Sequence, residues 1–107
     1  SGVTLALTSG VRAAQLVVAQ LAGEEVDWAK SYEAPMRAGL DVFRNYVDAW
    51  YDGTLPQLFF RPGKSENVRR QLCSMLAGYV WDDSNAMVKS PRRKLAQIRR
   101  TLLTAGA

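Results

Sequence analysis

The first segment of the chain, residues 1–23, has a hydrophobic pattern that predicts a helix apolar on almost every side. Its main apolar face collects Val3, Leu7, Gly10, Val11, Ala14, Val17, Val18 and Leu21. The polar side chains Thr4, Thr8, Arg12 and Gln15 form only a narrow line along the helix. A helix of this kind is typical of the interior of a large fold rather than the surface of a small bundle. We therefore expect a buried helix here, in a chain that is part of a longer protein.

The next long segment also has helical periodicity, with an aromatic-rich stripe. Asp27 is a good N-cap for this helix, which should end at Asp52–Gly53. Pro35 cannot donate a hydrogen bond to the carbonyl of Ser31. The pattern therefore predicts either a kink at Pro35 or a helix that restarts there. The stripe consists of Trp28, Tyr32, Met36, Leu40, Phe43, Val47 and Trp50.

Three further helical segments follow. Thr54 can cap a short helical turn, Ser65 can cap a third main helix, and Ser90–Pro91 supplies the cap and first residue of a last helix. No alternating run is long enough for a strand. The sequence therefore predicts an all-α fold of about four helices plus one short helical turn. Residues 1–23 should be the buried helix and residues 24–107 a helical C-terminal region, with no complete nucleotide-binding domain.

The cysteine and histidine content excludes several kinds of site within the chain. There is no histidine, and Cys73 is the single cysteine. A zinc site of cysteines and histidines, a Ser–His or Cys–His dyad and an intrachain disulfide therefore cannot form. The neighbours of Cys73 in the sequence are apolar, so we expect it to be a small core residue.

The net charge is +4, and the positive residues are concentrated in two groups, in residues 61–70 and 89–100. Such groups can meet phosphate or an acidic partner, but solvated helix faces are the more common case. No segment offers about 18 uninterrupted apolar residues, so we expect no membrane span. A cytoplasmic setting is the default expectation.

Two features could carry chemistry, and each has a structural alternative. A helix that begins at Ser1–Gly2 presents free N–H groups and partial positive charge to an anion, as every helix N-terminus does. Glycine there would let a flat ligand approach the backbone. The aromatic residues could line a pocket for an aromatic or lipid-like substrate, although core packing is the more common use of such residues. They are Trp28, Trp50, Trp81, Tyr46, Tyr51 and Tyr79.

The opening stretch reads Ser-Gly-Val-Thr-Leu-Ala-Leu-Thr-Ser-Gly-Val-Arg-Ala-Ala over residues 1–14. It resembles the Ser-Gly-Val-x-Leu-Ala-x-x-Ser-Gly-x-x-Ala-Ala segment of FAD-dependent oxidoreductases. The group in question comprises flavin-dependent halogenases, monooxygenases and geranylgeranyl-reductase-like proteins. Residues 32–33, 41–44, 50–53 and 69–81 resemble the C-terminal helical part of the halogenase-like branch.

The resemblance implies a position beside a flavin for the first helix. The backbone N–H groups of Gly2, Val3 and Thr4 would then face the N1/O2 edge of the flavin, where the reduced ring carries negative charge. In halogenases of the family, backbone amides at the Ser-Gly step also hold the halide, which here implies Ser1 and Gly2. The second helix would cover the substrate side with Phe43, Tyr46, Trp50 and Tyr51.

The chain departs from the family in what it lacks. It has no G-x-G-x-x-G after a strand, no acidic ribose partner and no Gly-Asp motif for the flavin. In full-length relatives these features lie earlier, as do the halogenase lysine and the Trp-x-Trp-x-Ile-Pro motif. We therefore expect this chain alone neither to hold FAD nor to catalyse. Its expected partner is the missing N-terminal FAD-binding portion.

Two other interpretations stay open from the sequence. The chain could be a small basic helical module that binds nucleic acid or an acidic protein through residues 90–100. It lacks a recognisable helix-turn-helix turn and stacking aromatics beside the basic run, which weighs against nucleic acid. The chain could also be a homo-oligomer in which the first helix is buried against its own copy.

Overall fold

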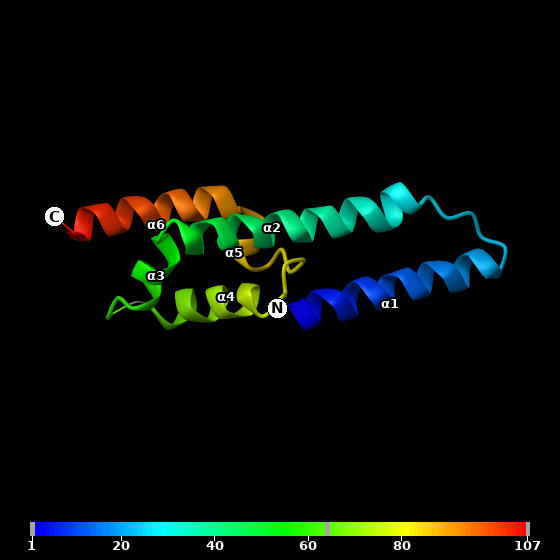
Figure 1. Cartoon of the computed structure of the whole chain (residues 1–107), viewed down its shortest axis with the longest axis horizontal. Helices are drawn as coiled ribbons and strands as arrows, with labels where there is room; N and C mark the ends of the chain where they lie inside the picture. Colours follow the sequence, from blue (N-terminus) through cyan, green and yellow to red (C-terminus); the bar gives the residue numbers. More distant parts are fainter. Residues whose placement is uncertain (1, 64, 107) are drawn as a thin grey trace.

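A computed structural model describes residues 2–63 and 65–106, with side chains described as far as Thr104. The molecule is elongated, with principal dimensions of 62 × 23 × 19 Å (Figure 1). The described residues contain helices and no strand, which confirms the all-α prediction. The elements are α1 (Gly2–Leu21), η1 (Ala29–Glu33), α2 (Ala34–Tyr51), α3 (Thr54–Phe59), α4 (Glu66–Leu76), α5 (Ala86–Lys89) and α6 (Pro91–Gly106).

The helix ends follow the predicted capping residues at most positions. Asp27 Oδ1 accepts from the backbone N–H of Ala29 at 3.1 Å, and Ser65 Oγ accepts from that of Val68 at 3.1 Å. Each interaction satisfies an N–H group that the first helical turn leaves unpaired. The last helix begins at Pro91, as predicted.

The cap of α3 and the whole of α5 differ from the sequence-based expectation. Thr54 is the first residue of α3 rather than its cap, and the Asp52 carboxylate accepts from the backbone N–H of Thr54 at 2.9 Å. The Thr54 hydroxyl is buried and accepts instead from Arg99 Nε at 3.2 Å. The unexpected helix α5 is one turn long, and the side chain of Asn85 caps it by accepting from the backbone N–H of Met87 at 3.0 Å. A helix this short has no hydrophobic periodicity to detect.

Pro35 lies at the start of α2, directly after the π-helical turn η1. The predicted restart of the helix at Pro35 was wrong, because Trp28, Glu33 and Ala34 all have helical backbone angles and η1 continues directly into α2. Because proline has no N–H, the carbonyl of Ser31 is left without its usual helical partner. That carbonyl accepts from Arg12 Nε at 3.1 Å. The missing N–H of Pro35 thus leaves free the acceptor that links α1 to η1.

The hydrophobic core is built by α2 to α6 and the segment before α5. The phenol of Tyr46 donates to the backbone carbonyl of Met87, and burial raises the pKa of this phenol. Arg99 on α6 forms an ion pair with Asp52 at 2.8 Å and so fastens α6 to the end of α2. The buried hydrophobic residues are Tyr46, Ala49, Leu55, Leu58, Leu72, Met75, Val80, Met87, Val88 and Leu95.

The indole of Trp81 lies directly on the backbone of α2. Its Nε1–H donates to the carbonyl of Pro35 at 2.6 Å. A Cβ atom on Gly39 would lie 2.3 Å from the Trp81 ring, closer than real Cβ atoms approach other atoms. Glycine at position 39 therefore makes room for the indole.

Helix α1 has no buried residue within this chain. It packs mainly on η1, and its half-buried Leu5 also contacts the core cluster. In Figure 1 it runs antiparallel to α2 and separates from the other helices towards its C-terminal end. Its exposed large hydrophobic residues are Val3, Leu7, Val11, Val17, Val18 and Leu21.

By length and composition, α1 is the helix of the described chain that could cross a membrane, with a mean hydropathy of 1.4. The sequence-based expectation of no membrane span rested on uninterrupted apolar residues, whereas a mean value tolerates Thr4, Thr8 and Arg12. The same length and hydropathy are found in the core helices of larger soluble proteins. The exposed apolar surface of α1 is therefore also compatible with the prediction that residues 1–23 are buried in a longer protein.

Cys73 is exposed, so the prediction that it is a core residue was wrong. The buried positions of α4 are Leu72 and Met75. Successive residues of an α-helix are separated by about 100°. Apolar neighbours in the sequence therefore do not place Cys73 on the buried face.

Candidate functional site

The predicted flavin contacts lie at the N-terminus of α1, on an open surface. Val3 is 74% exposed and Thr4 is half-buried. A Cβ atom on Gly2 would have no atom within 4 Å in this chain. Ser1 lies outside the described residues. The first turn of α1 contains no acidic residue, so no carboxylate in that turn offsets the partial positive charge of the helix terminus.

A groove of about 440 Å³ lies between the N-terminal half of α1 and the η1–α2 segment. Leu5 and Ser9 line it from α1, and Met36 and Leu40 line it from α2. Trp81 also lines the groove, from the turn after α4. The groove therefore starts within one or two turns of the α1 N-terminus, and its walls are mainly apolar. Its remaining lining residues are Ala6, Tyr32, Glu33 and Arg37.

The four residues expected on the substrate side occupy different environments along α2. Tyr46 is fully buried, and Phe43 packs partly buried against the core. Trp50 is 44% exposed and contacts the ring of Phe59 edge-on, with the ring centroids 6.0 Å apart. Tyr51 is 85% exposed. None of the four lines the groove between α1 and α2, and their assignment to a substrate stays a prediction.

From the sequence, Trp81 is a candidate pocket or core residue, and its contact with Gly39 is not predicted. The signal that could have found this contact is a glycine in the middle of an amphipathic helix, where alanine is usually favoured. Such a glycine often marks the close approach of another group. Here the group is an indole that also lines the groove.

Several cations of the two basic groups are paired within the chain. Arg69 and Arg70 lie 2.7 Å and 3.7 Å from carboxylate oxygens of Glu66, and Arg99 pairs with Asp52. These pairs are exposed or half-exposed, so each stabilises the fold only slightly. They do reduce the number of cations free for an external acidic partner.

The described part of the chain contains no group of three or more histidine, cysteine, aspartate or glutamate residues placed to hold a metal ion. The fold and surface thus define a helical segment with a small core, an apolar groove and one long apolar helix lacking cover within the chain. They do not define a complete catalytic centre.

The comparison with solved structures identifies the kind of protein that contains such a segment. The chain is similar to the crystal structure of a flavoprotein/dehydrogenase from Cytophaga hutchinsonii, with 39% sequence identity and a TM-score of 0.87. The match covers 95% of this chain and 25% of that protein. The chain thus spans about a quarter of the length of the flavoprotein that it matches. No protein-family model and no curated protein matches the sequence.

The residues of this chain fit only one edge of a flavin. The exposed N-terminus of α1 can face an anionic ring edge, and Gly2 leaves room for close approach. The chain has no glycine-rich phosphate loop and no strand among its described residues. Any pyrophosphate and adenosine of a dinucleotide would therefore have to be held by other parts of a longer protein.

Proposed function

We propose that this chain is the C-terminal helical segment of a longer flavin-dependent oxidoreductase. The observation that carries the proposal is the match to a quarter of a flavoprotein/dehydrogenase at 39% identity over nearly the whole chain. The apolar surface of α1 supports it, because a helix of this composition is stable when other structure covers it. The cover in this proposal is the flavin-binding portion that precedes residue 1.

In the proposed enzyme the α1 N-terminus lies beside the flavin. The N–H groups of residues 2–4 would hold the N1/O2 edge of the flavin, and the helix dipole would stabilise negative charge there. The flavin supplies the redox chemistry. The chain's contribution is electrostatic and steric, through the backbone at Gly2, Val3 and Thr4, together with Ser1.

The finer assignment within this proposal is a halogenase-like or monooxygenase-like enzyme with FAD. Its support is the resemblance of residues 1–14 to the Ser-Gly-Val segment of those families. The groove between α1 and α2 begins close to the same helix terminus and offers apolar walls to an organic substrate. On α2, the aromatic residues Phe43, Trp50 and Tyr51 add apolar side chains beyond the groove. Tyr46 anchors α2 in the core. A cytoplasmic location belongs to this proposal.

The test is the flavin content of a longer chain, extended upstream of residue 1. Expressed in cells that supply flavin, it should purify yellow, with absorbance bands near those of bound flavin and about one flavin per chain. A colourless protein that takes up neither added FAD nor added FMN would contradict the proposal. Chromatography of the released flavin distinguishes FAD from FMN.

A substitution at the helix N-terminus tests the position of the flavin. Gly2→Val should weaken flavin binding by about tenfold, because the added side chain blocks close approach. Its Cβ meets nothing within 4 Å in this chain, so its own fold gives no reason for a loss. Gln15→Val is the control, since Gln15 is exposed on the polar line of the same helix and lies away from its N-terminus. Unchanged flavin binding in Gly2→Val, or an equal loss in both variants, would contradict the placement.

A further inference from the structure

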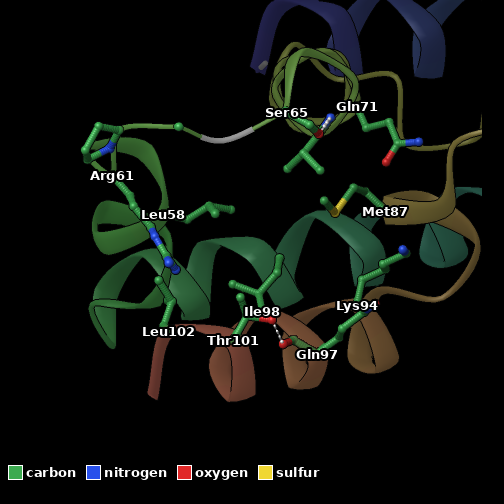
Figure 2. Close-up of a pocket in the computed structure, with 13 residues that line it drawn as sticks. Leu58, Arg61, Ser65, Gln71, Met87, Lys94, Gln97, Ile98, Thr101 and Leu102 are labelled. Carbon is green, nitrogen blue, oxygen red and sulfur yellow. Dashed lines mark hydrogen bonds between the residues drawn. The ribbon is translucent and has the colours of Figure 1, made fainter. Parts of the chain in front are cut away.

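A second pocket, of about 350 Å³, lies between the α3–α4 connection, α4, α5 and α6. Figure 2 shows its lining side chains. The apolar surface comes mainly from Leu58, Val68, Met87, Ile98 and Leu102. This volume falls near the lower end of the range typical of small-molecule sites, about 300–1,000 Å³. The pocket shares no residue with α1 or with the groove beside it.

The charged groups of this pocket are all cationic. Arg61 and Lys94 line it, and no carboxylate does. Neither side chain takes part in an ion pair or hydrogen bond among the described residues. Both residues are half-buried, so their aliphatic parts lie against the protein. Other cations of the chain, such as Arg69 and Arg99, have carboxylate partners.

The two cations lie at opposite ends of the pocket, with Leu58, Met87 and Ile98 between them (Figure 2). Neutral polar groups also line it, including Gln71. A cation beside an apolar surface favours a ligand that is anionic at one end and apolar elsewhere. In such a site the charge-assisted hydrogen bond sets the orientation, and apolar contact adds affinity.

We propose that this pocket binds a small amphipathic carboxylate, with the carboxylate on Arg61 or Lys94 and the hydrocarbon part on Leu58, Met87 and Ile98. This site does not depend on the proposed flavin enzyme. It uses no residue of α1 or of the groove beside it, so a failure to bind flavin leaves it intact.

Decanoate, below its micellar concentration, is a suitable probe, and 1-decanol is the uncharged control of the same chain length. Isothermal titration of the protein, in the longest form that its gene encodes, should show saturable 1:1 binding of decanoate. Binding of 1-decanol should be at least about tenfold weaker, because its neutral hydroxyl cannot form an ion pair with Arg61 or Lys94. Affinity for decanoate should fall as salt is raised from 20 to 500 mM.

The variant Arg61→Gln/Lys94→Gln should reduce decanoate affinity by about tenfold or more. Arg93→Gln/Arg100→Gln is the matched control, because it removes two exposed cations of α6 that do not line the pocket. Circular dichroism verifies that each variant is folded. Val18→Ser, on the exposed face of α1, should retain decanoate binding, and a loss of affinity in this variant would place decanoate on α1 and overturn the proposal.

Equal affinity for decanoate and 1-decanol would overturn the proposal, as would an unchanged affinity in the Arg61/Lys94 variant. If that variant does not fold, the salt series decides. A decanoate affinity independent of salt would then overturn the proposal. A decrease in affinity with salt for decanoate, without one for 1-decanol, would support it.

Discussion

Helix α1 and the α2–α6 region use their hydrophobic residues in opposite ways. Helix α1 is the most continuously apolar part of the chain, yet none of its residues is buried within this chain. Helix α4 carries several charged and polar residues, yet it buries Leu72 and Met75 completely or nearly so. Burial therefore depends on the arrangement of apolar positions and on the partner that covers them, more than on their number.

The comparison also distinguishes two kinds of stability. The α2–α6 region contains a core closed by its own residues. Helix α1 is attached mainly through η1, the Arg12–Ser31 hydrogen bond and Leu5. We expect α1 to contribute little to the unfolding free energy of this chain and to gain its stability from the structure that covers it in the proposed longer enzyme.

The largest expected effect comes from truncating matched leucines in the two regions. Leu72→Ala removes a side chain that is 1% exposed and should lower the unfolding free energy of the chain by about 3 kcal/mol. Leu7→Ala removes one that is 64% exposed and should change it by less than about 0.5 kcal/mol. Urea unfolding followed by circular dichroism measures both. Equal losses would show that α1 is part of the same core.

A smaller effect is expected from alanine at two glycines. Gly39→Ala forces its Cβ against the Trp81 ring and should destabilise the chain by about 2 kcal/mol, with a shift in tryptophan fluorescence. Gly10→Ala, in the open α1, has no such contact and should stabilise the helix by about 0.5–1 kcal/mol. Thermal unfolding with fluorescence detection compares the two variants. A stabilising Gly39→Ala would mean that the indole does not occupy this position.

The smallest effect is expected at the ion pair that closes the α2–α6 region. Hydrogen bonds from Thr54, followed by the interaction with Arg99, lower the pKa of Asp52 below its ordinary value. A lowered folded-state pKa adds stability above the unfolded-state pKa, and this stability is lost as pH falls through the folded-state pKa. Asp52→Asn should therefore cost about 0.5–1 kcal/mol at pH 7, after allowance for the half-exposed pair, and less below pH 3.

Asp48→Asn is the matched control for that measurement, since Asp48 is exposed on the same helix. It should leave the stability nearly unchanged at both pH values. Urea midpoints at pH 7 and pH 3 give the comparison. A pH-independent effect of Asp52→Asn would show that the carboxylate charge is not what stabilises this junction.

Most of the secondary structure was predictable because its signals are local. Asp27 and Ser65 cap the helices that they were expected to cap, and Pro91 begins the last helix. The loss of one helical hydrogen bond at Pro35 was also predictable, because it follows from a missing N–H. Each of these features depends on residues a few positions apart in the sequence.

The features that were not predictable depend on distant parts of the chain. Three features could be predicted only by knowing which helix faces which. They are the contact of Trp81 with Gly39, the burial of the Thr54 hydroxyl beside Arg99 and the exposure of Cys73. The pocket between Arg61 and Lys94 likewise joins residues from separate elements. Hydrophobic periodicity predicts that a helix has an apolar face, but not what packs against it.

The sequence by itself determined that the chain is helical, where most helices begin, and that its opening stretch resembles a flavoprotein segment. The tertiary structure alone decided that the core belongs mainly to α2–α6 and that no residue of α1 is buried within this chain. The physical reason is that capping and helix formation are local, whereas burial needs a partner surface that the local sequence does not specify.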